Sequence, residues 1–222
     1  MTTVLVFVAH PDDEVLGAGG TLATLAQRGA TINVVFANDG GINHTTRDYN
    51  LRDEARAACK VLGANEPHFL NFPDQRLDIV AHQDMNNALE KLKLPDPDIL
   101  FTHRSGDVNR DHECVHRSAL VYARPPRVGM VVACEVLSSS EWGTQPFAPN
   151  WFFPLTQESL ERKCDALACY EQEMRTTPHP RSKHGVLRLA ETRGMQGGYK
   201  YAEAFQVLKA YGDFRCATKK EK

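Results

Sequence analysis

The sequence predicts an α/β fold in which strands and helices alternate to build a doubly wound, mainly parallel sheet with helices on both faces. Short apolar runs such as 4–9 and 31–37 show no polar alternation, which is typical of strands buried on both faces. Longer segments with helical periodicity separate these runs. No linker rich in Pro, Ser or Gly divides the 222 residues, so we expect one domain over 1–222.

Each element at the start of the chain follows from a local pattern. The strand at 4–9 precedes a helix at 15–28, which carries leucines on one side. A second strand at 31–37 ends in a turn sequence of Asn, Asp and Gly. The helix at 51–62 stops at Gly63, a residue type suited to the position after a helix end.

The later elements are predicted in the same way, although the last third of the chain is less regular. Prolines at positions 95 and 97 break the chain before the fourth strand, because proline cannot donate a backbone hydrogen bond. The remaining expected elements are strands at 68–72, 98–103 and 129–137 and helices at 76–92, 111–122, 157–172 and 201–211.

The composition narrows the class of partner and the compartment. The formal net charge is −2, whereas a nucleic-acid-binding protein usually carries a basic surplus, so we expect no nucleic-acid partner. No apolar run approaches the roughly 20 residues that span a bilayer, and no basic region precedes the first apolar run as it would in a signal peptide. Six scattered cysteines without a CxxC pair fit free thiols, so we expect a cytoplasmic protein.

Polar residues follow four of the predicted strands. In doubly wound sheets ligands bind at the carboxyl ends of the strands, so the position of these residues is informative. They are His10, Asp12 and Asp13 after the first strand, Asp39 after the second, Asp74 and Arg76 after the third, and His103, Asn109, Asp111 and His112 after the fourth. One such cluster is an ordinary polar loop, but four at one edge predict a cleft lined by carboxylates and imidazoles.

These residue types indicate a metal site. Two histidines and a carboxylate are a common catalytic zinc shell. His10 and Asp13 lie three residues apart at the strand-to-helix turn, which Pro11 stiffens, and His112 is the best-placed third ligand. Asp12 is not needed as a ligand and could accept a proton from metal-bound water, although an Asp-Asp pair also suits a simple helix cap. We expect Zn²⁺, while Fe²⁺ or another divalent metal also suits these donors.

The run Ala9–Glu14, followed by the glycine-rich 17–22, resembles the signature of the PIG-L/LmbE-like deacetylases. A second signature, a histidine preceded by aspartate after a later strand, is matched by 106–112. The resemblance in element order covers roughly the first 140 residues. It implies a Rossmann-like three-layer sandwich and a zinc-dependent hydrolase that removes the acetyl group from an N-acetylated amino sugar or its glycoconjugate. It also makes a homo-oligomer an expectation.

The resemblance assigns a role to particular residues. The implied zinc ligands are His10, Asp13 and His112, the implied general base is Asp12, and Asp111 is a supporting or catalytic partner. Asn109 stands where some members have a histidine that polarises the amide or assists the leaving group. An asparagine cannot donate a proton as an acid, but it can hydrogen-bond a developing oxyanion. Either Asp12 or His103 must then return a proton to the departing amine.

Two other motifs suggest different functions. Residues 112–116 fit the H-E-x-x-H pattern of zinc proteases, in which Glu113 is the base and His116 a ligand. That alternative leaves His10 and Asp13 unexplained. The glycines at 17 and 19 suggest a dinucleotide-binding loop, but its third glycine is absent. Close packing of the helix on the sheet explains these glycines better.

The substrate contacts are less determined. The candidates are Asp39, Arg52, Asp74, Arg76 and His103, with Arg47 and Arg104 available for an anionic group. The loop around Asp74 fits helix capping equally well. The ring of Trp142, which follows Glu141, could stack on a sugar or belong to the core. Residues 193–198 are rich in glycine, and we expect a mobile loop there that acts as a lid.

Overall fold

The computed structural model describes residues 1–39, 41 and 51–212, so the candidate Arg47 lies outside the described residues. Within them, one sheet has the strand order β3-β2-β1-β4-β5-β7-β6. The strands are β1 (Thr3–Val8), β2 (Thr31–Phe36), β3 (His68–Phe69), β4 (Ile99–His103), β5 (Met130–Cys134), β6 (Trp151–Pro154) and β7 (Ala202–Ala210). The helices are α1 (Asp13–Gln27), α2 (Arg52–Leu62), α3 (His82–Lys91), α4 (Arg110–Tyr122), α5 (Gln157–Ala168) and α6 (Lys183–Gly197), with 3-10 turns η1 (Leu77–Ile79) and η2 (Ser140–Trp142).

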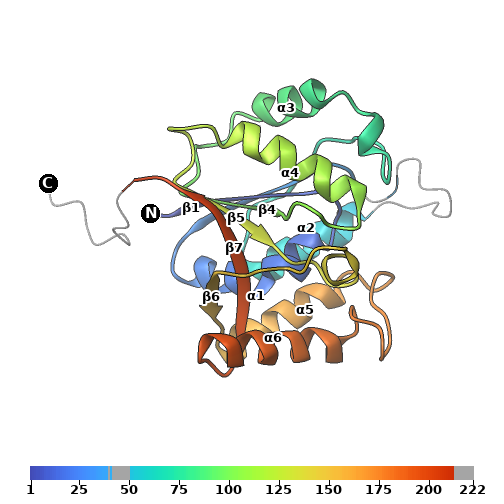
Figure 1. Cartoon of the computed structure of the whole chain (residues 1–222), viewed down its shortest axis with the longest axis vertical. Coiled ribbons are helices and arrows are strands. Elements are labelled where there is room, and N and C mark those ends of the chain that lie inside the picture. Colours follow the sequence, from blue (N-terminus) through green and yellow to red (C-terminus); the bar gives the residue numbers. More distant parts are fainter. Residues whose placement is uncertain (40, 42–50, 213–222) are drawn as a thin grey trace, which may run out of the picture.

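The elements form three layers, with α3 and α4 on one face of the sheet and α1, α2, α5 and α6 on the other (Figure 1). Strands β1 to β5 pair in parallel, whereas β7 pairs antiparallel with both β5 and β6. The predicted α/β class with a mainly parallel sheet is therefore confirmed.

The first strand shows why its residues are all apolar. Val4, Val6 and Val8 face the core beneath α1 and α2, whereas Leu5 and Phe7 face the core beneath α3 and α4. A strand buried on both faces cannot alternate between apolar and polar residues. This double burial fixes the position of the polar loop that follows β1.

Gly17 allows α1 to pack closely on the sheet, as the sequence predicts, whereas a Cβ atom on Gly19 would meet Lys163 of α5 rather than the sheet. A Cβ atom on Gly17 would lie 2.8 Å from the Cβ atom of Cys134 in β5, closer than side-chain atoms normally approach. The helix therefore sits tightly on the sheet directly after the turn that carries the candidate ligands.

Two predictions for the last third are wrong. Residues 201–211, predicted as a helix, contain β7, because pairing with β5 and β6 outweighs the helix propensity of the alanine-rich segment. Residues 193–197, predicted as a mobile lid, are the final turns of α6, and Gly198 with φ 78° ends that helix. Arg193 is held there by two hydrogen bonds to Glu135, of 2.7 and 2.6 Å.

The remaining differences are smaller. The helix expected at 76–92 is divided into η1 and α3. Strand β6 was not predicted. No described helix is both long enough and apolar enough to cross a membrane.

Candidate active site

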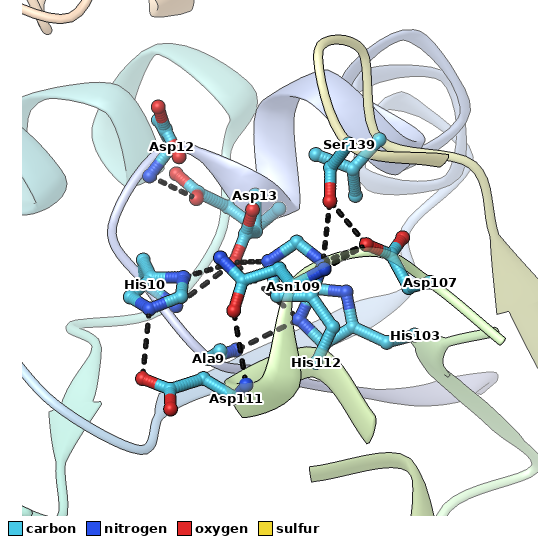
Figure 2. A network of polar contacts seen from close by, with 12 residues as sticks. Ala9, His10, Asp12, Asp13, His103, Asp107, Asn109, Asp111, His112 and Ser139 are labelled. Carbon is cyan, nitrogen blue, oxygen red and sulfur yellow. Dashed lines mark hydrogen bonds and ion pairs between the residues drawn. The ribbon is translucent and has the colours of Figure 1, made fainter. Parts of the chain in front are cut away.

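The candidate site lies where the strand order reverses. After β1 the chain adds β2 on one side, whereas β4 pairs with β1 on the other side. Helices that follow strands on opposite sides of such a point leave a crevice at the carboxyl ends. The loop after β1 carries His10 and Asp12, α1 begins at Asp13, and the loop and helix after β4 carry Asn109 and His112. The side chains of His10, Asp13, Asn109 and His112 converge in this crevice, with Asp12 at its edge (Figure 2).

His10, Asp13 and His112 form a buried group that could hold a cation. Their ligand atoms all lie within 4.8 Å of one another. The Oδ2 atom of Asp13 is 3.2 Å from His10 Nδ1 and 3.3 Å from His112 Nε2. The structure therefore brings together the three side chains that the sequence proposed as ligands, although 99 residues separate Asp13 from His112 along the chain.

The donor set fits a divalent metal for a second reason. The other carboxylate oxygen, Asp13 Oδ1, is buried and has no hydrogen-bond partner among the described residues. Although burial opposes ionisation, the adjacent imidazoles of His112 and His103 hold the pKa of Asp13 well below its usual range. A buried anionic oxygen without a partner is costly in a folded protein, and a bound cation removes that cost.

Carboxylates stand behind both imidazoles. His10 Nε2 is 3.1 Å from Asp111 Oδ2, and Asp111 Oδ1 accepts a hydrogen bond from the backbone N–H of Leu77 at 2.9 Å. His112 Nδ1 is 3.3 Å from Asp107 Oδ1. Such outer partners fix the orientation of a histidine ligand and raise its basicity. Although burial opposes protonation, Asp13 and Asp107 raise the pKa of His112 to about 8.

Asp74, predicted to contact substrate, lies in the same cluster as the candidate metal ligands. Its Oδ1 atom is 3.3 Å from His10 Nε2, and it forms with His10 and Asp111 a second buried group of possible ligands. His10 belongs to both groups: its Nδ1 atom faces Asp13, and its Nε2 atom faces Asp74 and Asp111.

Asp12 is buried beside the ligand group and is held by an arginine. Arg181 donates a hydrogen bond from Nη1 to Asp12 Oδ2 at 2.8 Å and another from Nε to the hydroxyl of Ser138 at 2.7 Å. Burial raises the pKa of Asp12 to about 7, and the charge of Arg181 opposes that rise. A carboxylate with such a pKa can both accept and donate a proton near neutral pH.

Asn109 and His103 have defined contacts. Asn109 Oδ1 caps α4 by accepting a hydrogen bond from Asp111 N at 2.9 Å, so the amide nitrogen faces the side of the site with His10 and Asp13 (Figure 2). His103 stacks on His112 with ring centroids 3.8 Å apart, and its Nε2 atom accepts a hydrogen bond from Ala9 N. Burial and the neighbouring charge of His112 lower the pKa of His103 to about 4.

Other candidate substrate residues lie in less direct positions. Asp39 and Arg52 bind each other, with Arg52 Nε 3.0 Å from Asp39 Oδ2. Arg76 is exposed at the start of η1. Arg104 is buried and donates to the backbone oxygens of Ser140 and Gln145, so it supports the loop that carries η2.

The H-E-x-x-H residues and the tryptophan can now be placed. His116 Nδ1 lies 2.8 Å from the backbone oxygen of His103, and Glu113 forms an ion pair of 3.0 Å with the exposed Arg110. The described metal-ligand groups contain neither residue. Trp142 is 56% exposed, which excludes the core alternative, and its ring meets His179 edge-to-face at 5.9 Å.

Sequence reasoning missed residues that contact the site from the second half of the chain. Neither Arg181 nor Tyr170 was predicted to lie at the site, and Asp107 was included only in the matched run 106–112, without a role of its own. The hydroxyls of Ser139 and Ser140 both donate to Asp107, which they tie to the loop before η2. Neither Arg181 nor Tyr170 lies in a recognisable motif, so no local signal could have found them.

Comparison with known proteins identifies the family. A family model described as PIG-L: GlcNAc-PI de-N-acetylase matches residues 5–123. The chain is also 33% identical over 170 residues to the uncharacterized deacetylase YaiS of Escherichia coli K12, a match that covers 74% of this chain and 88% of YaiS.

Solved structures under 25% identical share the fold. The N,N'-diacetylchitobiose deacetylase of Pyrococcus horikoshii has a TM-score of 0.72 at 18% identity, covering 93% of this chain and 84% of that one. A zinc-inhibited form of the teicoplanin deacetylase Orf2 has a TM-score of 0.73 at 19% identity, covering 96% and 100%. GalB of Pseudomonas putida KT2440, a 4-carboxy-2-hydroxymuconate hydratase, has a TM-score of 0.75 at 23% identity, covering 98% and 100%.

Since one of these structures belongs to a hydratase, the fold alone does not determine the reaction. The family model and YaiS carry the assignment, because the model matches more than half of the chain and the YaiS alignment spans most of both chains. The chain belongs to the PIG-L family and is a deacetylase, an amide hydrolase, of that family.

Proposed function

We propose that this chain is a zinc-dependent hydrolase that removes the acetyl group from the nitrogen of an amino sugar or its glycoconjugate. The observation that carries the proposal is the convergence of His10, Asp13 and His112 at one point of the sheet edge, with Asp12 beside them. Two imidazoles and one carboxylate leave coordination positions open for water or substrate, as in many catalytic zinc sites. The orphaned Oδ1 atom of Asp13 supports the same assignment.

In the proposed reaction the amide and the water are activated by a bound zinc ion, and Asp12 transfers the proton. When bound by His10, Asp13 and His112, a zinc ion supplies a Lewis acid that polarises the amide carbonyl and acidifies water. Asp12 accepts the proton of the attacking water as the new C–O bond forms at the carbonyl carbon. Asp12 then returns that proton to the nitrogen as the C–N bond breaks. The products are acetate and a free amine.

Asn109 and His103 take supporting roles in this scheme. The amide nitrogen of Asn109 donates a hydrogen bond to the oxyanion, since its oxygen already caps α4. His103 does not return the proton to the amine in this scheme, because its ring is buried against His112 and its Nε2 atom already accepts a hydrogen bond from Ala9 N. Its stacked ring instead keeps His112 in place.

The proposed substrate class rests on relatives and on one exposed side chain. The matched family model is described as a GlcNAc-PI de-N-acetylase, and the Pyrococcus horikoshii enzyme is named a diacetylchitobiose deacetylase. Both names specify the removal of an acetyl group from an N-acetylated sugar. Trp142 offers an exposed indole ring in η2, whose first residue, Ser140, donates a hydrogen bond to Asp107 behind His112, and a sugar can stack on such a ring.

Three variants test the proposal. We expect His10→Ala to lose both bound zinc and acetate release, because it removes a ligand. Asp12→Ala should keep zinc but reduce kcat by about 10²- to 10⁴-fold, since it removes only the base. Metal content is measured by elemental mass spectrometry and acetate release with N,N'-diacetylchitobiose as the substrate.

Glu113→Gln is the matched control, because this carboxylate pairs with Arg110 on the outer side of α4. We expect it to retain full activity, and its inactivation would favour the protease alternative. Full activity in Asp12→Ala, or in a chelated, metal-free preparation, would contradict the proposed chemistry.

A further inference from the structure

Asp12 has a backbone conformation that is unusual for a residue with a side chain. Its φ is 107° and its ψ is −28°, in a region that favours glycine. The strain is not relieved by a side-chain cap, because the Asp12 side chain makes no capping hydrogen bond to α1. Strained residues of this kind persist only where the surrounding structure holds them, and they concentrate at functional sites.

Glu14 makes the contact that holds this conformation. The backbone N–H of Asp12 donates to Glu14 Oε2 at 3.0 Å, and both residues are buried. This hydrogen bond crosses the tight turn from Asp12 to the first turn of α1. A buried backbone N–H without such an acceptor is costly, so the Glu14 carboxyl group stabilises the strained turn directly. The proposed chemistry does not otherwise use Glu14.

Tyr170 fixes Glu14 from a distant part of the chain. Its hydroxyl donates to Glu14 Oε1 at 2.6 Å across 156 residues of sequence, and its ring is fully buried in the core. Both carboxyl oxygens of Glu14 therefore accept a hydrogen bond, Oε1 from the Tyr170 hydroxyl and Oε2 from the Asp12 N–H. Tyr170 lies in the segment between α5 and α6, which also carries Arg181, the partner of the Asp12 carboxylate.

We propose that Glu14 and Tyr170 are positioning residues for the reaction: Tyr170 fixes Glu14, and Glu14 holds the backbone of Asp12 and thereby the position of its carboxylate next to Asp13. This inference rests on the proposed role of Asp12 as the base. Tyr170 lies outside the residues matched by the family model, 5–123, so the segment after α5 completes a site whose base lies within the matched part. Misplacing a reacting group by about 1 Å can cost about 100-fold in rate.

Tyr170→Phe is the first test, because it removes only the hydroxyl and keeps the buried ring. We expect kcat for acetate release to fall about 10- to 100-fold. KM and the zinc content should stay unchanged, since His10 and Asp13 are untouched. Tyr122→Phe is the control. Tyr122 is the last residue of α4, whereas the candidate ligand His112 lies near the start of that helix, and Arg127 packs over the tyrosine ring. We expect this variant to keep full activity.

Two variants of Glu14 give an independent test. Glu14→Gln keeps an oxygen acceptor for the Asp12 N–H, whereas Glu14→Leu has a similar size and no acceptor. We expect the glutamine variant to retain at least about 10-fold more activity than the leucine variant at equal zinc content. Equal losses in the two variants would overturn the proposal.

A double-variant cycle separates positioning from general stability. If Tyr170 acts through Asp12, adding Tyr170→Phe to Asp12→Ala lowers the residual kcat no further. Additive losses, or unchanged kcat in Tyr170→Phe alone, would overturn the positioning role. Full activity in Asp12→Ala alone would instead contradict the proposed function, so the two failures are distinguishable.

Discussion

The ion pair between Arg181 and Asp12 predicts a measurable shift in the pH dependence of catalysis. Arg181→Met removes the cation that lies 2.8 Å from Asp12 Oδ2 and keeps most of the apolar stem. Burial already raises the pKa of Asp12 to about 7 while Arg181 opposes the rise. Without the positive charge of the arginine, the ionised form of Asp12 is less stable, so we expect its pKa to increase.

The direction and size of the effect follow from this change. The base works only when it is ionised, so activity is lost as the pH falls through its pKa. If the pKa rises by about one unit, equivalent to about 1.4 kcal/mol, the ionised fraction at pH 7 falls from about one half to about one tenth. We therefore expect kcat/KM to fall about 5-fold at pH 7 and to recover at about two pH units higher.

The assay is kcat/KM for acetate release across the range from about pH 5.5 to about pH 9.5. Arg175→Met is the matched control, because Arg175 lies in the same segment between α5 and α6 but donates, among the described residues, to the backbone oxygens of Gln172 and Met174. An acid limb that stays in place, or that moves to lower pH in Arg181→Met, would refute the reasoning.

Two further predictions concern stability. Lys163→Met leaves the buried Glu203 carboxylate without the lysine that lies 2.6 Å away, so we expect the free energy of unfolding in urea to fall by about 3–5 kcal/mol. A loss below about 1 kcal/mol would show that the pair is not needed. Gly17→Ala places a Cβ atom 2.8 Å from Cys134 Cβ and should cost about 1–3 kcal/mol in the same assay. An unchanged midpoint would mean that α1 can move away from the sheet freely.

The local motif was informative because its residues are neighbours along the chain. His10 and Asp13 lie in one turn, so their spacing alone indicates that they share a site. His112 required one further step, the rule that the strand ends of a parallel sheet meet at one edge. The same rule places Asp74 and Asp111 at this edge of the sheet. Only the structure shows that they face Nε2 of His10, whereas Asp13 faces Nδ1.

The substrate residues were harder to predict, because a polar loop residue has many possible partners. Asp39 and Arg52, both predicted to contact substrate, form an ion pair with each other, which the sequence did not indicate. Arg104 was expected to meet an anion, yet it donates to two backbone oxygens. A sequence gives the type of polar group but not which group satisfies it.

The sequence by itself determined the parallel half of the fold and the placement of the metal-ligand motif, because double burial makes a strand uniformly apolar and a tight turn keeps its residues together. The tertiary structure decided the antiparallel edge, where β7 forms from a segment with helix propensity. It also decided what surrounds Asp12: Tyr170 lies 156 residues from Glu14, and Arg181 lies 169 residues from Asp12. Contacts at such separations depend on how α5 and α6 pack against α1 and the sheet, and that packing leaves no periodic pattern in the chain.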